Sequence, residues 1–374
     1  MKIHIYHANA GYGHRKIAEV IAAAIQKKGG QEAQVLLRDA LEDTPAIFRK
    51  SYPETYFFLV KNMPALWGRS YEFLDRSQVA ASVRPLRRIF NAVYEKRFLR
   101  KVIDSRPDGV ICTHFFSAEV LASARRKGLL RCPLVVVITD FMPHAFWINE
   151  GTDYYWVMNE STRAEMERRG IPSERIMAGG IPVGESFKPQ GTRGQVLRKY
   201  GLDPSRLSIL MTSGSFGLGP YPAILEHLKT VASRVQCLMV CGNNQTMRSE
   251  LEKRSFPFPI KVFGFINFMD ELMEASDLLI AKSGGSTTVE SLTKGVPMVV
   301  LKPIPGQETR NAEFLKSHGA SFSMNAPEQI LPIMNAILGH PEILRERKEA
   351  LERIAKPNAA SDIADFVMTK LAYA

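Results

Sequence analysis

Long apolar runs are missing from this sequence of 374 residues. Its most apolar stretch, residues 133–138, has the length of a strand, whereas a helix that spans a membrane needs about 20 apolar residues in a row. We therefore do not expect an integral membrane protein. The first residues, MKIHIYHANAGYGH, are interrupted by histidine, asparagine and glycine, which argues against a cleaved signal peptide and predicts a cytoplasmic protein.

Cysteine is also scarce. The four cysteines form no Cys-x-x-Cys pair, and most of them lie in or beside apolar runs, so buried thiols are expected rather than a metal cage. Neither Asp-x-Asp nor the His-Glu-x-x-His spacing of zinc enzymes occurs. The sequence therefore predicts neither a metal nor a cofactor. Any negative charge on a leaving group then has to be stabilised by amides and hydroxyls.

What is present is an ordinary globular composition, 45% hydrophobic and 23% charged, in a chain long enough for two domains. Short apolar runs alternate with helical patterns, which predicts an α/β fold with parallel sheets covered on both faces. Residues 184–194, rich in glycine and charge, are expected to link two doubly wound, Rossmann-like domains with an interdomain cleft. The expected strands are residues 2–7, 33–37, 109–113, 134–139, 208–211, 236–240, 260–262, 278–281 and 298–301.

Positive charge is concentrated in one stretch. The net charge of the chain is +11, and residues 44–101 alone carry 12 basic side chains against four acidic ones. Eleven aromatic residues lie in the same stretch. Such a mixture suits a surface that lies on anionic lipid, although nucleic-acid binding uses the same residue types. Amphipathic helices with core aromatics and solvated charges are the purely structural alternative.

Two loops rich in glycine and serine follow expected strands in the C-terminal half, at residues 213–219 and 282–288. Glycine allows close approach of a backbone, and hydroxyls and helix N-termini bind phosphate, so the two loops suggest a diphosphate held from two sides. Tight turns need glycine for steric reasons as well. Glu290, in the next helix, can accept hydrogen bonds from both hydroxyls of a ribose, although a carboxylate there also stabilises the helix dipole.

A polar turn at residues 305–312 follows the strand expected at residues 298–301. Its Gln307, Glu308 and Asn311 can bond the hydroxyls of a sugar. Helix capping on a solvated loop explains the same three residues equally well.

The N-terminal half begins with a strand, a turn at residues 9–14 and a helix. The turn is a truncated dinucleotide-binding motif in which Lys16 stands in place of the third glycine, and Asp39 keeps nicotinamide binding open as an alternative. His14 lies at the helix N-terminus, where the dipole disfavours its charged form, so a neutral imidazole is available as a base. Asp140, after another strand, is positioned to orient that base or the substrate. Both residues are also ordinary caps.

Several motifs, taken as a set, resemble a known family. They are Gly11-Tyr12-Gly13-His14, Thr139-Asp140-Phe141 with His144 and Trp147, residues 180–183 (GIPV), 241–244 (CGNN) and 264–266 (GFI), Lys282-Ser283-Gly284-Gly285, Glu290 and residues 305–308 (PGQE). In this order they closely resemble the bacterial processive diacylglycerol glucosyltransferases and the plant monogalactosyldiacylglycerol synthases. The N-acetylglucosaminyltransferase of peptidoglycan precursor synthesis is a more distant likeness. The resemblance runs from about residue 3 to about residue 320.

The resemblance implies a GT-B fold with an acceptor and membrane-facing domain, residues 1–187, and a UDP-sugar domain, residues 188–357. A final helix, residues 358–374, would return to the first domain. The implied reaction is an inverting transfer of glucose or galactose from UDP-glucose or UDP-galactose to diacylglycerol, at the cytoplasmic face of a membrane. Anionic lipids are implied as partners, and nucleic acid is not. A non-catalytic sensor of UDP-sugar or lipid, a UDP-sugar epimerase and a transferase with a soluble acceptor remain alternatives.

The family's site residues carry over by position. His14 matches the loop histidine that activates the acceptor hydroxyl or steadies the donor phosphate, with Asp140 assisting. The backbone around Phe265 and Ile266 would meet the uracil, and Glu290 the ribose. The diphosphate would meet Ser215 and the Ser283 loop, and the sugar would meet Gln307 and Glu308. The remaining donor-binding candidates are Gly13, Gly214, Gly242, Asn243, Gly284, Gly285, Ser286, Thr287 and Asn311, and the acceptor or membrane candidates are Phe57, Phe58, Trp67, Arg84, Arg87, Arg88, His144 and Trp147.

The sequence departs from the family in two places. Gly-Tyr-Gly-His stands where the plant enzymes have Gly-Gly-Gly-His, which leaves the position of the histidine unchanged. Gln307-Glu308-Thr309-Arg310 stands where the bacterial relatives have Gly-Gln-Glu-Lys. The second departure leaves the choice of sugar open.

Overall fold

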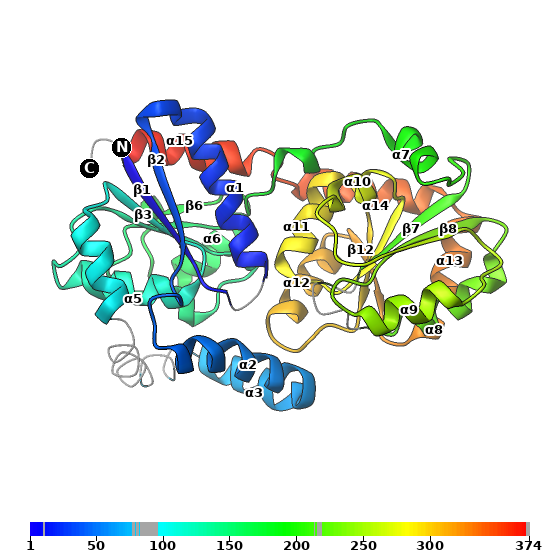
Figure 1. Cartoon of the computed structure of the whole chain (residues 1–374), viewed down its shortest axis with the longest axis horizontal. Helices are drawn as coiled ribbons and strands as arrows, with labels where there is room; N and C mark the ends of the chain where they lie inside the picture. The colour runs from blue at the N-terminus through cyan, green and yellow to red at the C-terminus, as the bar shows by residue number, and fades with distance from the viewer. Residues whose placement is uncertain are drawn as a thin grey trace. The chain divides into compact units, whose positions relative to one another are not determined.

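The structure is a computed structural model that describes residues 1–9, 12–76, 79, 82, 96–212, 214 and 219–371 (Figure 1). The chain divides into two compact units. The first unit consists of Met1–Gly184, Ile304–Gln307 and Lys356–Ala374, and the second of Glu185–Pro303 and Glu308–Ala355.

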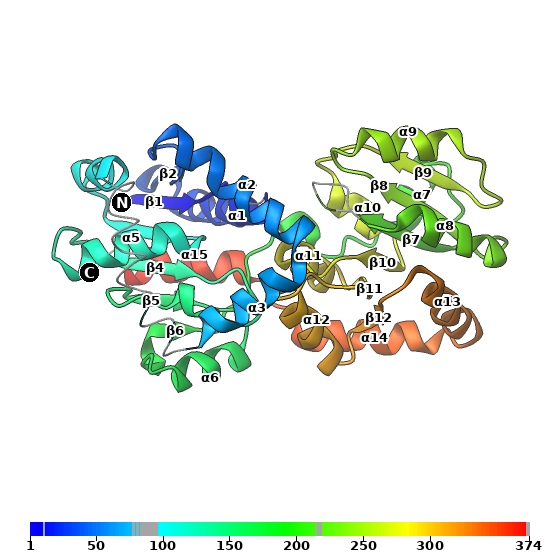
Figure 2. The ribbon, with the colours of Figure 1, turned by 90° about the horizontal axis from the view of Figure 1, so that it is seen from below.

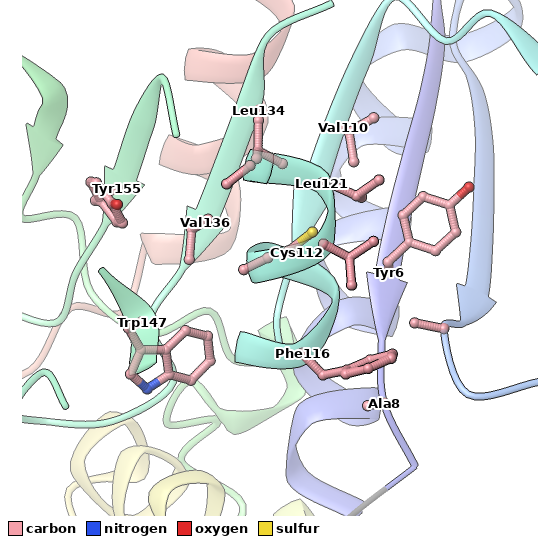
Figure 3. Close-up of a cluster of buried hydrophobic side chains, with 14 of the residues drawn as sticks. Tyr6, Ala8, Val110, Cys112, Phe116, Leu121, Leu134, Val136, Trp147 and Tyr155 are labelled. Atoms are coloured by element: carbon pink, nitrogen blue, oxygen red, sulfur yellow. The ribbon is translucent and has the colours of Figure 1, made fainter. Parts of the chain in front are cut away.

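A parallel six-stranded sheet forms the centre of the first unit, in the order β2-β1-β3-β4-β5-β6. Its strands are β1 (Lys2–His7), β2 (Gln34–Asp39), β3 (Gly109–Cys112), β4 (Leu134–Val137), β5 (Tyr154–Trp156) and β6 (Ile176–Met177). Its labelled helices include α1 (Tyr12–Gly29), α5 (Phe115–Arg126), α6 (Glu160–Arg168) and α15 (Ala359–Lys370). Figure 3 shows α5 on one face of this sheet, with α1 and α15 behind the other face.

Both faces of the inner strands β1, β3 and β4 are buried, as expected when helices cover each side of parallel strands. On the α5 face, alternate strand residues such as Val110, Cys112 and Val136 form one apolar cluster with Phe116 and Leu121 of the helix (Figure 3). On the other face, α15 packs along α1. Sequence-distant parts of the chain therefore complete the layers of the first unit.

The second unit contains another parallel six-stranded sheet, in the order β12-β11-β10-β7-β8-β9. Its strands are β7 (Leu207–Thr212), β8 (Val235–Val240), β9 (Ile260–Phe263), β10 (Leu278–Ala281), β11 (Met298–Leu301) and β12 (Ser321–Met324). Its helices are α7 (Arg193–Lys199), α8 (Tyr221–Leu228), α9 (Gln245–Lys253), α10 (Met269–Glu274), α11 (Gly285–Lys294), α12 (Gln307–Ser317), α13 (Ile330–Gly339) and α14 (Glu342–Ile354). Apolar residues of α8, α9 and α13 join strand residues in one core cluster.

Two helices of the first unit, α2 (Ala46–Asn62) and α3 (Pro64–Asp75), form a pair outside the layers of the first sheet (Figure 1 and Figure 2). Large apolar side chains of this pair are exposed: Phe58 by 57%, Leu66 by 49% and Phe73 by 53%. Such exposure is unusual for residues of this type unless a partner covers them. None of the described helices is both long and apolar enough to cross a membrane.

The segment that follows the boundary at residue 184 is bonded to the rest of the second unit through a buried ion pair. Lys294 Nζ lies 2.9 Å from a carboxylate oxygen of Glu274, and the two side chains are only 2% and 7% exposed. The same ammonium group donates to the carbonyls of Ser186 and Lys188, at 2.8 and 3.0 Å. The Glu274 carboxylate also accepts bonds from two backbone N–H groups of the segment, those of Gln190 and Thr192.

All four cysteines are free thiols, as the sequence predicts. Cys112, Cys237 and Cys241 are fully buried, and Cys132 is half-buried. Burial raises the pKa of Cys112 to about 12 and the pKa values of Cys132 and Cys241 to about 11. At neutral pH the native protein therefore holds almost no thiolate, which is the reactive form of cysteine.

The nine strands expected from the sequence are confirmed, with ends that move by at most two residues. Three further strands, β5, β6 and β12, were not expected. Two of them are only two or three residues long, and β12 carries serine at alternate positions, so none has an apolar run. The expected linker at residues 184–194 is not wholly irregular, because it contains a short 3₁₀ helix, Glu185–Phe187, and the start of α7.

Candidate functional site

The strand order of the first sheet reverses between β1 and β3, because the chain runs from β1 to β2 on one side and to β3 on the other. In doubly wound sheets, ligands bind at the carboxyl ends of the strands at such a switch point. Tyr6 of β1 pairs with Cys112 of β3, so the loops after the two strands start at the same level. His14 follows the first of these strands, and His114 follows the second.

The ring of His14 is held in one orientation by the loops after β3 and β4. Its Nδ1 lies 2.8 Å from the carbonyl oxygen of Thr113 and 3.0 Å from the hydroxyl oxygen of Thr139. A carbonyl oxygen can only accept, so Nδ1 carries the proton and donates it. The lone pair of the neutral ring is therefore on Nε2, the atom that can accept a proton from a substrate.

The pKa of His14 supports the expectation of a neutral imidazole. Burial lowers this pKa to about 4, and nearby His7 adds to the effect, while the bond to Thr113 opposes it. At neutral pH the ring is uncharged. The bond to Thr113 then selects which of its two tautomers is present.

His114 was not singled out from the sequence, yet it lies against His14. Their ring centroids are 4.7 Å apart in an edge-to-face arrangement. His114 is also the N-cap of α5, since its Nδ1 accepts a bond of 3.1 Å from the N–H of Phe116. Burial holds its pKa well below the ordinary value, with His14 and His7 contributing. The only available signal was that it directly follows a predicted strand at a switch point.

Asp140, expected to orient the base, belongs to a different hydrogen-bond network. One carboxylate oxygen accepts a 2.8 Å bond from the indole N–H of Trp147, and the other accepts a bond from the amide of Gln307, which belongs to the first unit. Trp147 in turn lies 6.2 Å from the ring of His14, measured between centroids. The bonds that orient His14 itself come from Thr113 and Thr139.

His144 and Trp147, expected at the acceptor or membrane surface, are buried with exposures of 2% and 1%. Nε2 of His144 lies 2.9 Å from the carbonyl oxygen of Tyr71 in α3 and donates to it. The N–H of Ala145 donates to Asp75 at the end of the same helix. Neither His144 nor Trp147 therefore contacts a bilayer directly. Instead, they join α3 to the segment that carries Asp140.

The other expected membrane residues have varied surroundings. Phe58 is exposed and Trp67 is half-buried. The side chain of Phe57 and all of Arg84, Arg87 and Arg88 lie outside the part of the chain that the structure describes.

The second sheet has its own switch point, between β7 and β10. Thr212 and Ala281, the last residues of these strands, pair with each other, so the loop after β7 and the loop before α11 begin side by side. Gly214 has a φ of +63°, which a side chain disfavours, and Ser215 lies outside the described residues. These are the two loops that the sequence predicts to hold a diphosphate.

The first turn of α11 presents unpaired donors. Its N-cap is Gly284, so no side chain caps the N–H groups of Gly285, Ser286 and Thr287. The hydroxyls of Ser286 and Thr288 are buried, and among the described residues they have no hydrogen-bond partner. Uncapped N–H groups at a helix N-terminus are a common site for phosphate. Glu290 follows on the same helix and is 6% exposed.

Ser283 and Asn311 hold this loop against α12. The hydroxyl of Ser283 donates to the carbonyl of Glu308 at 2.7 Å, and the amide of Asn311 donates to the carbonyl of Ser283 at 2.8 Å. Both side chains are completely buried. Ser283 and Asn311 therefore fix the shape of the loop through bonds within the protein, whereas the sequence predicted that they contact the donor directly.

The remaining donor candidates lie after β8 and β9. Gly242 has a φ of +58°, and Asn243 beside it is exposed. Phe265 is 52% exposed, a large fraction for a phenylalanine, and Ile266 is half-buried. The carboxyl edge of the second sheet thus carries glycine turns and an exposed aromatic ring next to the two loops at its switch point.

The buried histidines predict loss of stability in mild acid. Burial, with Lys2 and Arg38, lowers the pKa of His4 to about 4, so between pH 6.5 and 4 the unfolded chain binds a proton that the folded chain does not. Stability is complete above pH 6.5 and falls as the pH decreases, by about 2 kcal/mol at pH 5 for this residue. We expect His4→Gln to reduce the loss between pH 7 and pH 5, measured by urea unfolding. An unchanged pH dependence would contradict the assignment.

Comparison with known proteins agrees with the geometry of both units. Residues 14–183 match the family model described as monogalactosyldiacylglycerol (MGDG) synthase, and residues 209–365 match the family 28 glycosyltransferase C-terminal domain. Together the two ranges cover most of the chain. The two matches identify the chain as a glycosyltransferase. The resemblance seen in the sequence motifs is therefore confirmed.

Curated relatives are similar to this glycosyltransferase over nearly its whole length. A processive diacylglycerol beta-glucosyltransferase of Bacillus cytotoxicus is 28% identical over 98% of the chain and 93% of the relative. The protein of the same name from Bacillus cereus is 26% identical over 99% of the chain and 94% of the relative.

Solved structures confirm the GT-B fold of the glycosyltransferase. MurG of Acinetobacter baumannii superposes with a TM-score of 0.63 and 19% identity, covering 98% of this chain and 99% of MurG. UDP-GlcNAc 2-epimerase of Neisseria meningitidis, bound to UDP-GlcNAc, gives 0.62 and 14% identity over 98% and 100% of the two chains. Anabaena HepE in complex with UDP-glucose gives 0.58 and 14% identity over 99% and 100%. These likenesses concern the fold alone, since transferases and epimerases share it.

Proposed function

We propose that this glycosyltransferase moves a hexose from a UDP-sugar to the hydroxyl of diacylglycerol at a membrane surface, with inversion. The observation that carries the proposal is the neutral His14, whose Nδ1 proton is bonded to Thr113 and whose Nε2 can therefore accept a proton. The proposal of diacylglycerol as the acceptor rests on the names of the curated relatives. The proposal of a UDP-sugar as the donor rests on the complex of a protein with the same fold and UDP-glucose.

The proposed reaction is a single displacement. His14 Nε2 takes the proton of the acceptor hydroxyl while its oxygen forms a bond to the anomeric carbon of the sugar. The bond between that carbon and the diphosphate oxygen breaks, and UDP leaves with the electron pair. Attack from the side opposite the leaving group inverts the anomeric centre. One base is therefore enough.

In the proposal, the second unit holds the nucleotide of the donor. Backbone N–H groups of the first α11 turn, with the hydroxyls of Ser286 and Thr288, face the growing charge on UDP as it leaves. Glu290 accepts bonds from the ribose, and the backbone at Phe265 and Ile266 meets the uracil. Gln307 and Glu308 are assigned to the sugar. Charge is thus stabilised by amides and hydroxyls.

The exposed apolar residues of α2 and α3 support membrane contact. We expect the double variant Leu66→Ser, Phe73→Ser to bind vesicles of phosphatidylcholine and phosphatidylglycerol about tenfold more weakly. The two apolar side chains that would move from water into the membrane interface are then replaced by polar ones. Flotation of the purified protein measures this. Leu129→Ser is the matched control, since Leu129 is 50% exposed in the first unit and lies in the turn after α5. Equal loss in the control and the double variant would contradict the assignment of this surface.

One assay tests the proposed function directly. The purified protein is incubated with diacylglycerol vesicles and a panel of UDP-sugars, and the lipids are identified by mass spectrometry. Hexosyl-diacylglycerol is the expected product, and its mass also shows whether a second sugar is added. Epimerisation of the UDP-sugar without any lipid product would replace the proposal, and so would transfer to a soluble acceptor only. Glu290→Gln, assayed in parallel, is expected to raise the KM for the donor.

A further inference from the structure

Two histidines, not one, stand at the switch point of the first sheet. His14 follows β1 and His114 follows β3, the two strands between which the order reverses. We propose that His114 is a positioning residue for glycosyl transfer, which holds the ring of His14 in place for proton removal from the acceptor. This inference rests on the proposed role of His14 as the base.

The contact between the two rings is specific. Their centroids are 4.7 Å apart and their planes meet at 81°, an edge-to-face geometry that favours one orientation of each ring. His114 is 2% exposed and also packs against the ring of Phe115, with 4.2 Å between ring centroids. A buried, packed ring of this kind leaves its neighbour little freedom to rotate.

The backbone around His114 fixes it in turn. Its Nδ1 accepts the N–H of Phe116, so the proton of the neutral ring is on Nε2. The carbonyl of the preceding residue, Thr113, accepts a bond from His14 Nδ1, and the hydroxyl of Thr113 donates to the carbonyl of His14. One dipeptide, Thr113-His114, therefore contacts His14 through two hydrogen bonds and one ring. The loop after β3 holds the base from one side.

The electrostatic surroundings agree with this geometry. The titratable groups around His14 are His7 at the end of β1, His114 before α5, and Asp140 after β4, the last through Trp147. Both neighbouring imidazoles are themselves neutral because burial lowers their pKa values. Removing the His114 ring would admit water to His14, so the pKa of His14 should then move up toward 6.5.

Two variants separate the ring from the cap. His114→Asn keeps an oxygen that can accept the Phe116 N–H but removes the ring. His114→Phe keeps a ring of similar shape but removes the cap acceptor. We expect His114→Asn to lower kcat at least tenfold with an unchanged KM for the donor, and His114→Phe to retain most of the turnover.

Nitrogen-15 NMR of the histidine rings gives a readout that does not depend on turnover. In the wild-type protein, His14 should show a protonated Nδ1 and stay neutral to about pH 5. In His114→Asn, the Nδ1 preference should weaken and the titration should move toward 6.5. Wild-type kcat and an unchanged His14 spectrum in His114→Asn would overturn the proposal. An equal loss of kcat in both variants with an unchanged His14 spectrum would also overturn it, because His114 would then act on the substrate itself. If His14→Ala retained full turnover, the proposed base would fail, while the spectra would still test the positioning.

Discussion

A His14→Ala enzyme is expected to lose about 10²- to 10⁴-fold in kcat, the range that a positioned general base contributes. The loss follows from the geometry of the ring. The contacts of Nδ1 with Thr113 and Thr139 keep the proton on Nδ1 and leave Nε2 as the acceptor, and alanine has no group that can replace it. Affinity for UDP should stay within about twofold, since the proposed contacts with the nucleotide lie in the second unit. Single-turnover kinetics with a UDP-sugar and diacylglycerol vesicles, together with calorimetric titration of UDP, measure both quantities.

A matched control for this experiment is His340→Ala. His340 is an exposed histidine of the second unit, with 68% of its side chain accessible and Glu342 as its partner. Its removal should leave kcat unchanged. Wild-type turnover in His14→Ala would remove the base from the mechanism, whereas a large loss of UDP affinity would move His14 from the acceptor to the donor phosphate.

Lys294→Met is expected to destabilise the second unit by about 3–5 kcal/mol, because it leaves the carboxylate of Glu274 buried without its counter-charge. Burial alone would raise the pKa of Glu274, yet the bonds from Lys294 and from the backbone hold it below its ordinary value. The carboxylate is therefore ionised at neutral pH and depends on the ammonium group. The loss should appear as a lower urea midpoint in far-UV circular dichroism.

The double variant Glu274→Gln with Lys294→Met is the control for this prediction. The glutamine keeps an oxygen for one of the two N–H groups of the linking segment, and both charges are gone, so the double variant should be more stable than Lys294→Met alone. All three tryptophans, Trp67, Trp147 and Trp156, belong to the first unit. Tryptophan fluorescence thus follows that unit separately. A Lys294→Met protein as stable as wild type would show that the pair is not needed.

Much of the fold could be predicted because most of its strands are buried and have the sequence of short apolar runs. β10 and β11 were expected with their exact ends, since each lies between polar or glycine-containing turns. β6 and β12 were missed because a strand of two residues and one with alternating serine carry no such run. Local sequence therefore fails where pairing with a neighbouring strand, rather than hydrophobicity, makes the strand.

The candidate site was predicted in part for a similar reason. Glycine loops after strands indicate a phosphate site from sequence alone, and the switch point between β7 and β10 places the ends of the two preceding strands side by side. The contacts of His14 with Thr113 and His114 join residues about 100 positions apart, which no local pattern encodes. The burial of Trp147 was missed because an aromatic residue in a polar loop looks the same whether it packs inward or outward.

The state of the cysteines has a practical consequence. Every native thiol is buried or half-buried, and burial raises the pKa values of the thiols well above neutrality. Maleimide reagents at pH 7 therefore find almost no thiolate to react with. A cysteine introduced at Phe73 would be the most accessible thiol of the chain. A spin label or fluorophore attached there would report immersion depth on vesicles without prior removal of any native residue.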